Sequence, residues 1–286
     1  MPKVAVVTDS TASLPSEVAE ELGILVVPLQ VVIGATSYDD GIDAEASPEH
    51  VAKALREYVP VSTSRPSPQV VLEAYRRAAA DGAEEIVSVH LSAEVSATYE
   101  SSLLAARRSP VKVHTVDTRQ IGAGTGYAAR SAAHAVAEGA TAAEAAEAAR
   151  ERAARVSSLF YVDTLEHLRR GGRVGAAQAL LGSALAVKPI LCVENGRISP
   201  KEKVRTAARA LARLEDLAVE AAGTSDIEVA VSHLANPDGA RSLADRLADR
   251  LTANLAGREV EVAEVAAVLG AHVGPGLVGV VVAPTS

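Results

Sequence analysis

EEIVSVHLSAEVSATYESSLLAARRSPVKVHTVDT, residues 84–118, is the stretch that decides the fold class of this chain. The β-rich runs at 84–92 and 111–118 predict two strands, and the segment at 96–108 between them predicts a helix. The same alternation begins at residues 3–23 and continues into 126–156. Repeated strand and helix units of this kind predict an α/β fold with a parallel sheet covered by helices.

Three polar loops follow the predicted strands, at residues 8–10, 92–98 and 117–126. Ligands of parallel α/β sheets bind beyond the carboxyl ends of the strands, where such loops lie. Ser96 stands near the start of the helix at 96–108, where free backbone N–H groups and the helix dipole favour an anion. Ser96 could equally be a plain helix cap, and the two roles are compatible because they use the same donors.

From about residue 157 the pattern changes. Residues 158–182 predict a strand, a short helix, a Gly-Gly turn and a second helix, and residues 188–200 predict a hairpin whose Asn195-Gly196 suits a type I′ turn. Helices are expected near 202–222 and 238–255, with a strand at 227–235 between them, and two strands are expected to flank the turn at 274–276. We therefore expect two domains, residues 1–156 and 157–286. The alanine-rich stretch at 128–156 predicts a surface helix.

The composition excludes several classes of protein. A net charge of −8, no Trp and one Phe argue against nucleic-acid binding, which rests on clustered cations and stacking aromatics. No apolar run is long enough to span a bilayer, and no secretory signal is visible. The single cysteine, Cys192, cannot form an internal disulfide. We expect a cytoplasmic protein without integral membrane association.

Two further stretches hold side chains that could bind a ligand. In VSTSRPSP, residues 61–68, Ser67 and Pro68 are explained as the start of a helix, whereas Thr63 and Ser64 are left as hydroxyl donors in a stiff loop. His272 lies in an apolar, strand-like run before a Gly-Pro-Gly turn. It is either a core imidazole bonded to a carbonyl or a ligand contact.

Other motifs are weaker. Gly122, Gly124 and Gly126 follow a strand, but their spacing differs from that of a dinucleotide fingerprint, and a close-packed loop is the preferred interpretation. Arg173 follows the Gly-Gly turn and is a candidate for phosphate or partner contact. The sequence contains no HExxH, CxxC, P-loop or GxSxG motif, so we expect no metal site.

Taken together, these stretches resemble the DegV family of bacterial fatty-acid-binding proteins. The resemblance rests on seven motifs in the family's order: VTDSTASLP (7–15), TSRPSP (63–68), LSAEVSATYES (91–101), VDTRQIGAGTG (116–126), DTLEHLRRGGRVG (163–175), KPIL (188–191) and GAHVGPGLVGV (270–280). It implies a two-domain DegV-type fold, with an N-terminal Rossmann-like parallel sheet and a C-terminal α/β domain with a mixed sheet.

The resemblance also implies a function. A long-chain fatty acid would lie in a buried tunnel near the domain interface, with its carboxylate at Thr63, Ser96 and His272. Supporting positions are Ser64, Ser92, Ala97 and Gly274, and the Gly-Pro-Gly turn would let the chain bend past the ligand head.

The resemblance further implies a carrier without catalysis or a cofactor of its own. A partner fatty acid kinase would phosphorylate the bound acid, and Arg173 is the candidate residue for partner docking or for stabilising the transferred phosphoryl group. The chain departs from the family pattern at Arg65, Ala93 and Ala97, where glutamine, serine and glycine are usual. Ala93 removes a hydroxyl but leaves the backbone donors.

Two alternatives stay open at this point. One is a hydrolase or acyl-transfer enzyme that uses His272 as general acid or base and Thr63 or Ser96 as nucleophile, with Asp9 or Asp117 as the orienting group. The other is a dinucleotide-dependent oxidoreductase, which rests on the glycine-rich loop alone.

Overall fold

The first of three sheets confirms the predicted parallel arrangement. The computed structural model describes residues 3–180 and 187–285. Four parallel strands lie in the order β2-β1-β6-β7: β2 (Ile24–Val27), β1 (Val4–Asp9), β6 (Glu85–His90) and β7 (Lys112–Asp117). The carboxyl ends of β1, β6 and β7 lead into the three polar loops at 8–10, 92–98 and 117–126, so these loops lie at one edge of the sheet.

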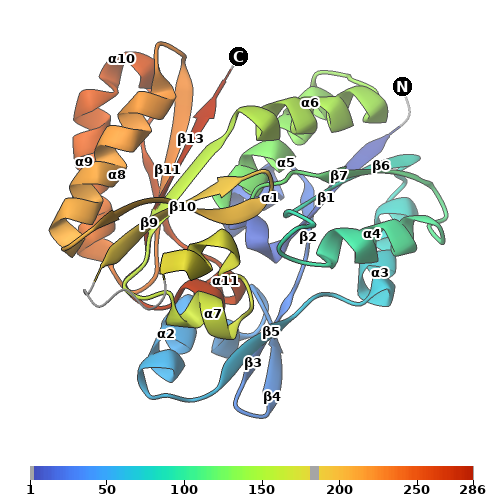
Figure 1. Ribbon diagram of the computed structural model, residues 1–286. Helices are drawn as coiled ribbons and strands as arrows, with labels where there is room; N and C mark the ends of the chain where they lie inside the picture. Colours follow the sequence, from blue (N-terminus) through green and yellow to red (C-terminus); the bar gives the residue numbers. More distant parts are fainter. Residues whose placement is uncertain (1–2, 181–186, 286) are drawn as a thin grey trace.

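Helices cover both faces of this sheet (Figure 1). One face packs on α3 (Pro68–Ala80) and α4 (Thr98–Ala106), and the other on α5 (Ala123–Ala137) and α6 (Ala142–Arg155). The last two correct the expectation of one surface helix at 128–156, because Gly139, with φ of +92°, interrupts it and the alanines of both helices are buried against the strands. A short helix, α1 (Ser16–Glu21), follows the 3₁₀ turn η1 (Ser10–Ala12).

The second sheet is mixed and has six strands in the order β10-β9-β8-β13-β11-β12. Its neighbours pair antiparallel except β11 with β12. The strands are β8 (Ser157–Tyr161), β9 (Lys188–Glu194), β10 (Arg197–Val204), β11 (Ile227–His233), β12 (Glu261–Glu264) and β13 (Val278–Pro284). The helices α8 (Ala207–Ala222) and α9 (Pro237–Arg250) form its main apolar core, and α10 (Thr252–Leu255) adds Leu255 to it.

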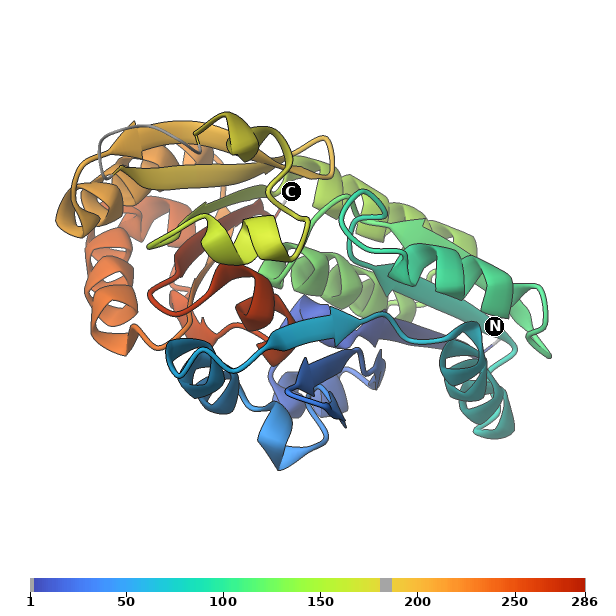
Figure 2. The ribbon, with the colours of Figure 1, turned by 60° about the horizontal axis from the view of Figure 1, so that its bottom comes forward.

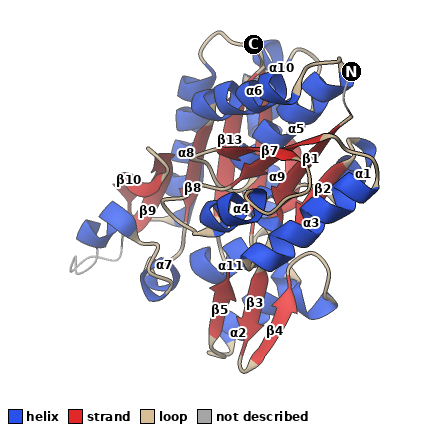
Figure 3. Cartoon of the chain, turned by 90° about the vertical axis from the view of Figure 1, so that its right-hand side faces the viewer, coloured by secondary structure: helices blue, strands red, loops and turns tan. Residues whose placement is uncertain are grey.

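A third, antiparallel sheet of order β4-β3-β5 was not expected from the sequence. It consists of β3 (Gln30–Ile33), β4 (Thr36–Asp39) and β5 (Val61–Ser64), with η2 (Ala44–Ala46) and α2 (Pro48–Arg56) between the last two. Figure 3 shows this sheet below helix α11 (Ala267–Val273), and Figure 2 shows α11, in red, beside β5. The N-terminal half of the chain therefore packs directly against a C-terminal helix, in a core that includes Leu29, Val31, Val51, Val268 and Ala271.

The structure corrects two expectations that concern the site. His272 lies in the last turn of helix α11, between β12 and β13, and not in a strand. Short apolar runs do not distinguish a strand from a buried helix, which explains the error. Thr63 lies in strand β5 and not in a loop, whereas Ser67 does cap α3, with Pro68 at its first position.

Smaller corrections fall in the second half. The helix expected at 202–222 begins later than predicted. Residues 202–204 belong to β10, and Thr206 caps the start of α8. After the short helix α7 (Glu166–Arg170), residues 175–180 form a 3₁₀ helix, η3 (Gly175–Leu180), and the end of the expected helix lies outside the described residues. Asn195 and Gly196 both have positive φ, as the predicted type I′ turn requires. No helix in the described ranges is long and apolar enough to cross a membrane.

Candidate functional site

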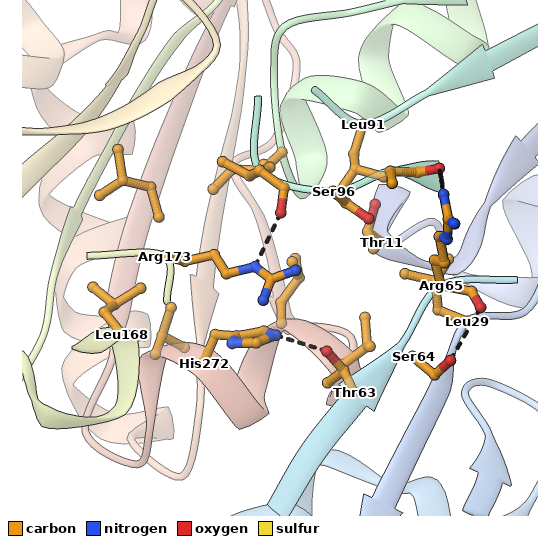
Figure 4. A pocket seen from close by; sticks show the side chains of 17 residues that line it. Thr11, Leu29, Thr63, Ser64, Arg65, Leu91, Ser96, Leu168, Arg173 and His272 are labelled. Carbon is orange, nitrogen blue, oxygen red and sulfur yellow. Dashed lines mark hydrogen bonds between the residues drawn. The ribbon is translucent and has the colours of Figure 1, made fainter. Parts of the chain in front are cut away.

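A cavity of about 370 Å³ gathers most of the residues predicted from the sequence. Its lining includes Thr63, Ser64, Ser96, Ala97, Arg173 and His272, as well as Arg65. Figure 4 shows the polar side chains converging on it from β5, α11, the loop before α4 and the segment after α7. None of the described residues that line this cavity is acidic, so the cavity presents two arginines and several hydroxyls with no competing carboxylate.

Thr63 and His272 contact each other at the bottom of this cavity. The distance from Thr63 Oγ1 to His272 Nε2 is 2.8 Å (Figure 4). Burial of the imidazole, and secondarily the nearby Arg173 guanidinium, lower the pKa of His272 to about 4, so the ring is neutral at pH 7. Nδ1 is buried without a hydrogen-bond partner in the described part of the chain. Because a buried N–H without an acceptor is costly, the tautomer with hydrogen on Nε2 is favoured.

This tautomer determines which way the hydrogen bond between His272 and Thr63 runs. Nε2–H of His272 donates to Thr63 Oγ1, and the Thr63 hydroxyl hydrogen is then free to point into the cavity. Gly171 is what lets the imidazole lie there, since a Cβ at residue 171 would overlap with His272 Nδ1. The sequence signalled only a turn at the Gly-Gly pair, and this steric requirement could not be read from it.

Ser96 lies where it was predicted, at the start of α4. Its Oγ accepts the backbone N–H of Thr98 at 3.3 Å and pairs with the Thr98 hydroxyl at 2.9 Å, and Ser96 also lines the cavity. Ser96 is not the N-cap of α4 as the plain interpretation expected, because Ala97 holds that position. The backbone N–H of Ala97, next along the chain, has no acceptor among the residues described. The sequence led us to expect a free backbone donor at Ala93. Its N–H instead donates to Asp117 Oδ1 at 3.2 Å.

Both arginines are held by carbonyl groups of the loop before α4. Arg173 donates through Nε to Val95 O at 3.0 Å and through Nη1 to Gly171 O at 2.6 Å. Arg65 donates to Ala97 O at 3.2 Å and lies 3.6 Å from the carboxylate of Glu100. Figure 4 shows Arg173 extending into the cavity, whereas the side chain of Arg65, which also lines it, is about half exposed.

Ser92 and Gly274 do not line this cavity. Ser92 is fully buried and donates to Gly196 O at 2.7 Å, which ties the loop to the β9–β10 hairpin. Gly274 ends α11 with φ of +77°, and a Cβ there would overlap with the His167 ring. The expected tight bend after His272 is thus present at Gly274. Ser92 and Gly274 support neighbouring segments and do not line the cavity.

A smaller apolar cavity of about 70 Å³ adjoins the first, and both are bordered by Ile121, Leu269 and Val273. It lies against the inner strands of the second sheet, with Leu159, Phe160, Val280 and Val281 among its lining residues. Ser158 and Ser232 are the polar residues in its described lining. The two cavities therefore share three apolar lining residues, whereas Thr63, His272 and the arginines line only the larger one.

The two carboxylates that could have oriented His272 in an enzyme, Asp9 and Asp117, have other partners. Asp9 is hydrogen-bonded to His90 and Asp117 to backbone N–H groups of Ala93 and Arg119, so neither orients His272. The Thr63–His272 pair therefore lacks the third group of a nucleophilic triad among the described residues. The described ranges also contain no cluster of three or more His, Cys, Asp or Glu that could hold a metal ion.

Comparison with known proteins decides the family. Residues 3–285 match the family model described as "Uncharacterised protein, DegV family". The chain belongs to the DegV family. It is 54% identical to a DegV domain-containing protein of Streptomyces coelicolor over 279 residues, which cover 98% of both chains.

Solved structures of DegV proteins share the fold. A structure titled as fatty acid binding of a DegV family protein from Thermus thermophilus matches with a TM-score of 0.89 at 32% identity, covering 99% of both chains. DegV of Bacillus subtilis, titled a fatty acid binding protein, matches with a TM-score of 0.89 at 30% identity over the full length of both chains. The α/β fold with a parallel and a mixed sheet is therefore that of the DegV family.

Proposed function

We propose that this DegV family member binds a long-chain fatty acid, with the carboxylate at the hydroxyl groups of the larger cavity and the acyl chain along the apolar lining of that cavity toward the smaller one. The observation that carries the proposal is the junction of the two cavities at Ile121, Leu269 and Val273. Similar structures whose titles name fatty acid binding support the same ligand class.

The polar end has the donors that a buried carboxylate requires. An unpaired charge in an apolar site costs several kcal/mol, so each oxygen needs hydrogen bonds. We assign these to the Thr63 hydroxyl, which His272 orients, to the Ser96 hydroxyl, and to the N–H of Ala97 before α4, which has no acceptor in the described part of the chain. Ser64 also lines this cavity, but its hydroxyl donates to Arg65 O at 3.2 Å and is not counted among these donors.

The apolar end supplies most of the affinity. Burial of a methylene group contributes about 0.8 kcal/mol, so a long acyl chain outweighs the head group in binding energy. The head group then sets the orientation of the ligand. The acyl chain would run between α11 and the strands β8 and β13, toward the second sheet.

We further propose a cytoplasmic carrier that presents its ligand to a partner fatty acid kinase and performs no chemistry itself. The acid-free cavity with Arg173 suits the extra negative charge of a transferred phosphoryl group. In domain terms, we propose a division near residue 156, where the second sheet begins, with the ligand between the two parts.

Mass spectrometry of ligands extracted from the denatured protein tests this proposal. We expect a long-chain fatty acid from the wild-type protein and a reduced amount from His272→Ala at an unchanged melting temperature. Absence of fatty acid, together with no uptake of added palmitate or oleate, would refute fatty-acid binding. Turnover of acyl esters that His272→Ala abolishes would instead establish the acyl-transfer alternative.

A further inference from the structure

A chain of buried hydrogen bonds links the neighbouring strands β1 and β6 of the first sheet to helix α3. His90 Nδ1 lies 2.8 Å from Asp9 Oδ2, and His90 Nε2 lies 2.7 Å from Ser88 Oγ. Ser88 Oγ lies in turn 2.8 Å from the hydroxyl of Tyr75. All four residues are fully buried, and none lines the larger cavity. Ser88, His90 and Asp9 have the connectivity of a catalytic triad, but Ser88 is bonded on both sides and cannot meet a substrate.

Asp9 is the end of this chain that contacts residues of the cavity wall. Its carboxylate accepts the backbone N–H and the hydroxyl of Thr11 at Oδ1, and His90 and the backbone N–H of Leu91 at Oδ2. A buried carboxylate is stable only when its oxygens are occupied in this way. Thr11 and Leu91 both line the larger cavity, so one carboxylate holds two parts of the cavity wall.

The wall that begins at Leu91 carries the polar groups of the site. The loop from Leu91 to Ala97 presents Ser96 to the cavity, and its Val95 and Ala97 carbonyls hold Arg173 and Arg65. Asp9 joins the start of this loop to η1 across the neighbouring strands β1 and β6. The spacing between the two walls therefore depends on the Asp9 carboxylate.

We propose that Asp9 is a positioning residue of the carboxylate site, which keeps the loop at 91–97 in its binding geometry without touching the ligand. This inference rests on the proposed function for its effect on binding, whereas the effect on the loop is independent of any ligand.

The variant Asp9→Asn tests the proposal. Asparagine offers one acceptor oxygen in place of two, so it cannot hold both Thr11 and Leu91. We expect amide hydrogen exchange at 91–97 to become at least about tenfold faster in protein stripped of lipid, and oleate affinity to fall roughly tenfold, as for loss of a buried charged hydrogen bond.

Tyr75→Phe is the matched control, because it breaks the same buried chain at the far end and leaves all four bonds to Asp9. We expect it to lower the melting temperature with unchanged exchange at 91–97 and unchanged oleate affinity. Equal behaviour of the two variants in exchange and affinity would reduce Asp9 to a structural residue and overturn the proposal.

If Asp9→Asn does not fold, Thr11→Val decides the question, since it keeps the carboxylate and removes one hydroxyl donor. We expect faster exchange both at 10–13 and at 91–97, and wild-type exchange at 91–97 would refute the proposal. Failure of the wild-type protein to bind oleate would refute the proposed function only, because the exchange contrast between Asp9→Asn and Tyr75→Phe would still be measurable.

Discussion

Thr63 and His272 are 209 residues apart in the chain, and their side chains meet at 2.8 Å in the wall of one cavity. One comes from an edge strand of the third sheet and the other from the last turn of α11. The contact therefore requires the N-terminal third of the chain to be packed on its C-terminal end. We expect binding of the ligand carboxylate to depend on this packing.

Thr63→Val keeps the shape of a β-branched strand residue and removes the hydroxyl donor. We expect the affinity for a long-chain fatty acid to fall about tenfold or more, because a hydrogen bond to a charged group contributes about 1.5–3 kcal/mol. Displacement of a fluorescent fatty acid measures the change. Ser62→Ala, its exposed neighbour on β5, serves as the control, and an equal loss in both variants would contradict the assignment.

Gly171→Ala is expected to act through His272. The added methyl group overlaps with Nδ1 and displaces the imidazole from Thr63, so affinity falls by about as much as in His272→Asn. The double variant, Gly171→Ala with His272→Asn, is expected to bind the fatty acid no more weakly than either single variant, since both substitutions remove the same contact. Additive losses in this cycle would show that Gly171 and His272 act separately.

Asp40 makes the free energy of unfolding depend on pH, and a substitution at this position removes that dependence. Burial raises the pKa of this carboxyl to about 6, although its Oδ1 accepts the N–H of Ala267 at the start of α11. The native state therefore holds a proton more tightly than the unfolded chain, and the resulting stability is present below about pH 4 and lost as the pH rises through about 6.

Asp40→Asn is accordingly expected to stabilise the protein at pH 7.5 by up to about 3 kcal/mol and by much less at pH 4.5. Urea unfolding at the two pH values measures this. The lowered pKa of His272 works in the opposite sense, with stability lost as the pH falls from about 6.5 toward 4, and this loss becomes visible in the variant. Glu45→Gln, exposed on the same segment, is the control, and a pH-independent effect of Asp40→Asn would show that titration of this carboxyl is not the cause.

Ala123→Phe is designed to fill the smaller apolar cavity, where Ala123 lies at the start of α5. We expect the variant to lose C18 acids and to retain shorter ones, as read from the chain lengths extracted with the protein. Ala143→Phe, on the exposed side of α6, controls for the added aromatic ring. An unchanged chain-length profile in Ala123→Phe would place the acyl chain elsewhere.

Arg173→Ala separates ligand retention from presentation to the kinase. Because Arg173 points into the cavity, we expect phosphorylation of the bound acid by a partner kinase to fall at least a hundredfold, while fatty-acid affinity falls less than tenfold. Formation of acyl phosphate measures the first and ligand displacement the second. Undiminished acyl phosphate formation would exclude the proposed role of Arg173.

The sequence predicted the parallel sheet and the helix that follows Ser96 because both have a local signal, the alternation of strand and helix patterns. It did not predict the third sheet, whose four-residue strands are too short for a clear periodicity. Gly171 was missed as a site residue, and Asp9 was considered only as the orienting group of an enzyme, for a different reason. Their roles lie in contacts with His272 and with the loop at 91–97, which only the tertiary structure brings near.

Strand β13 has a consequence for how the protein acquires its function during synthesis. It lies between β8 and β11 in the interior of the six-stranded sheet, although it is the last strand in the chain. The ribosome must therefore translate through residue 284 before this sheet can close, whereas all four strands of the first sheet are available once residue 117 has emerged. The Thr63–His272 contact belongs to the late stage, so every strand of the parallel sheet has been synthesised well before these two side chains can meet.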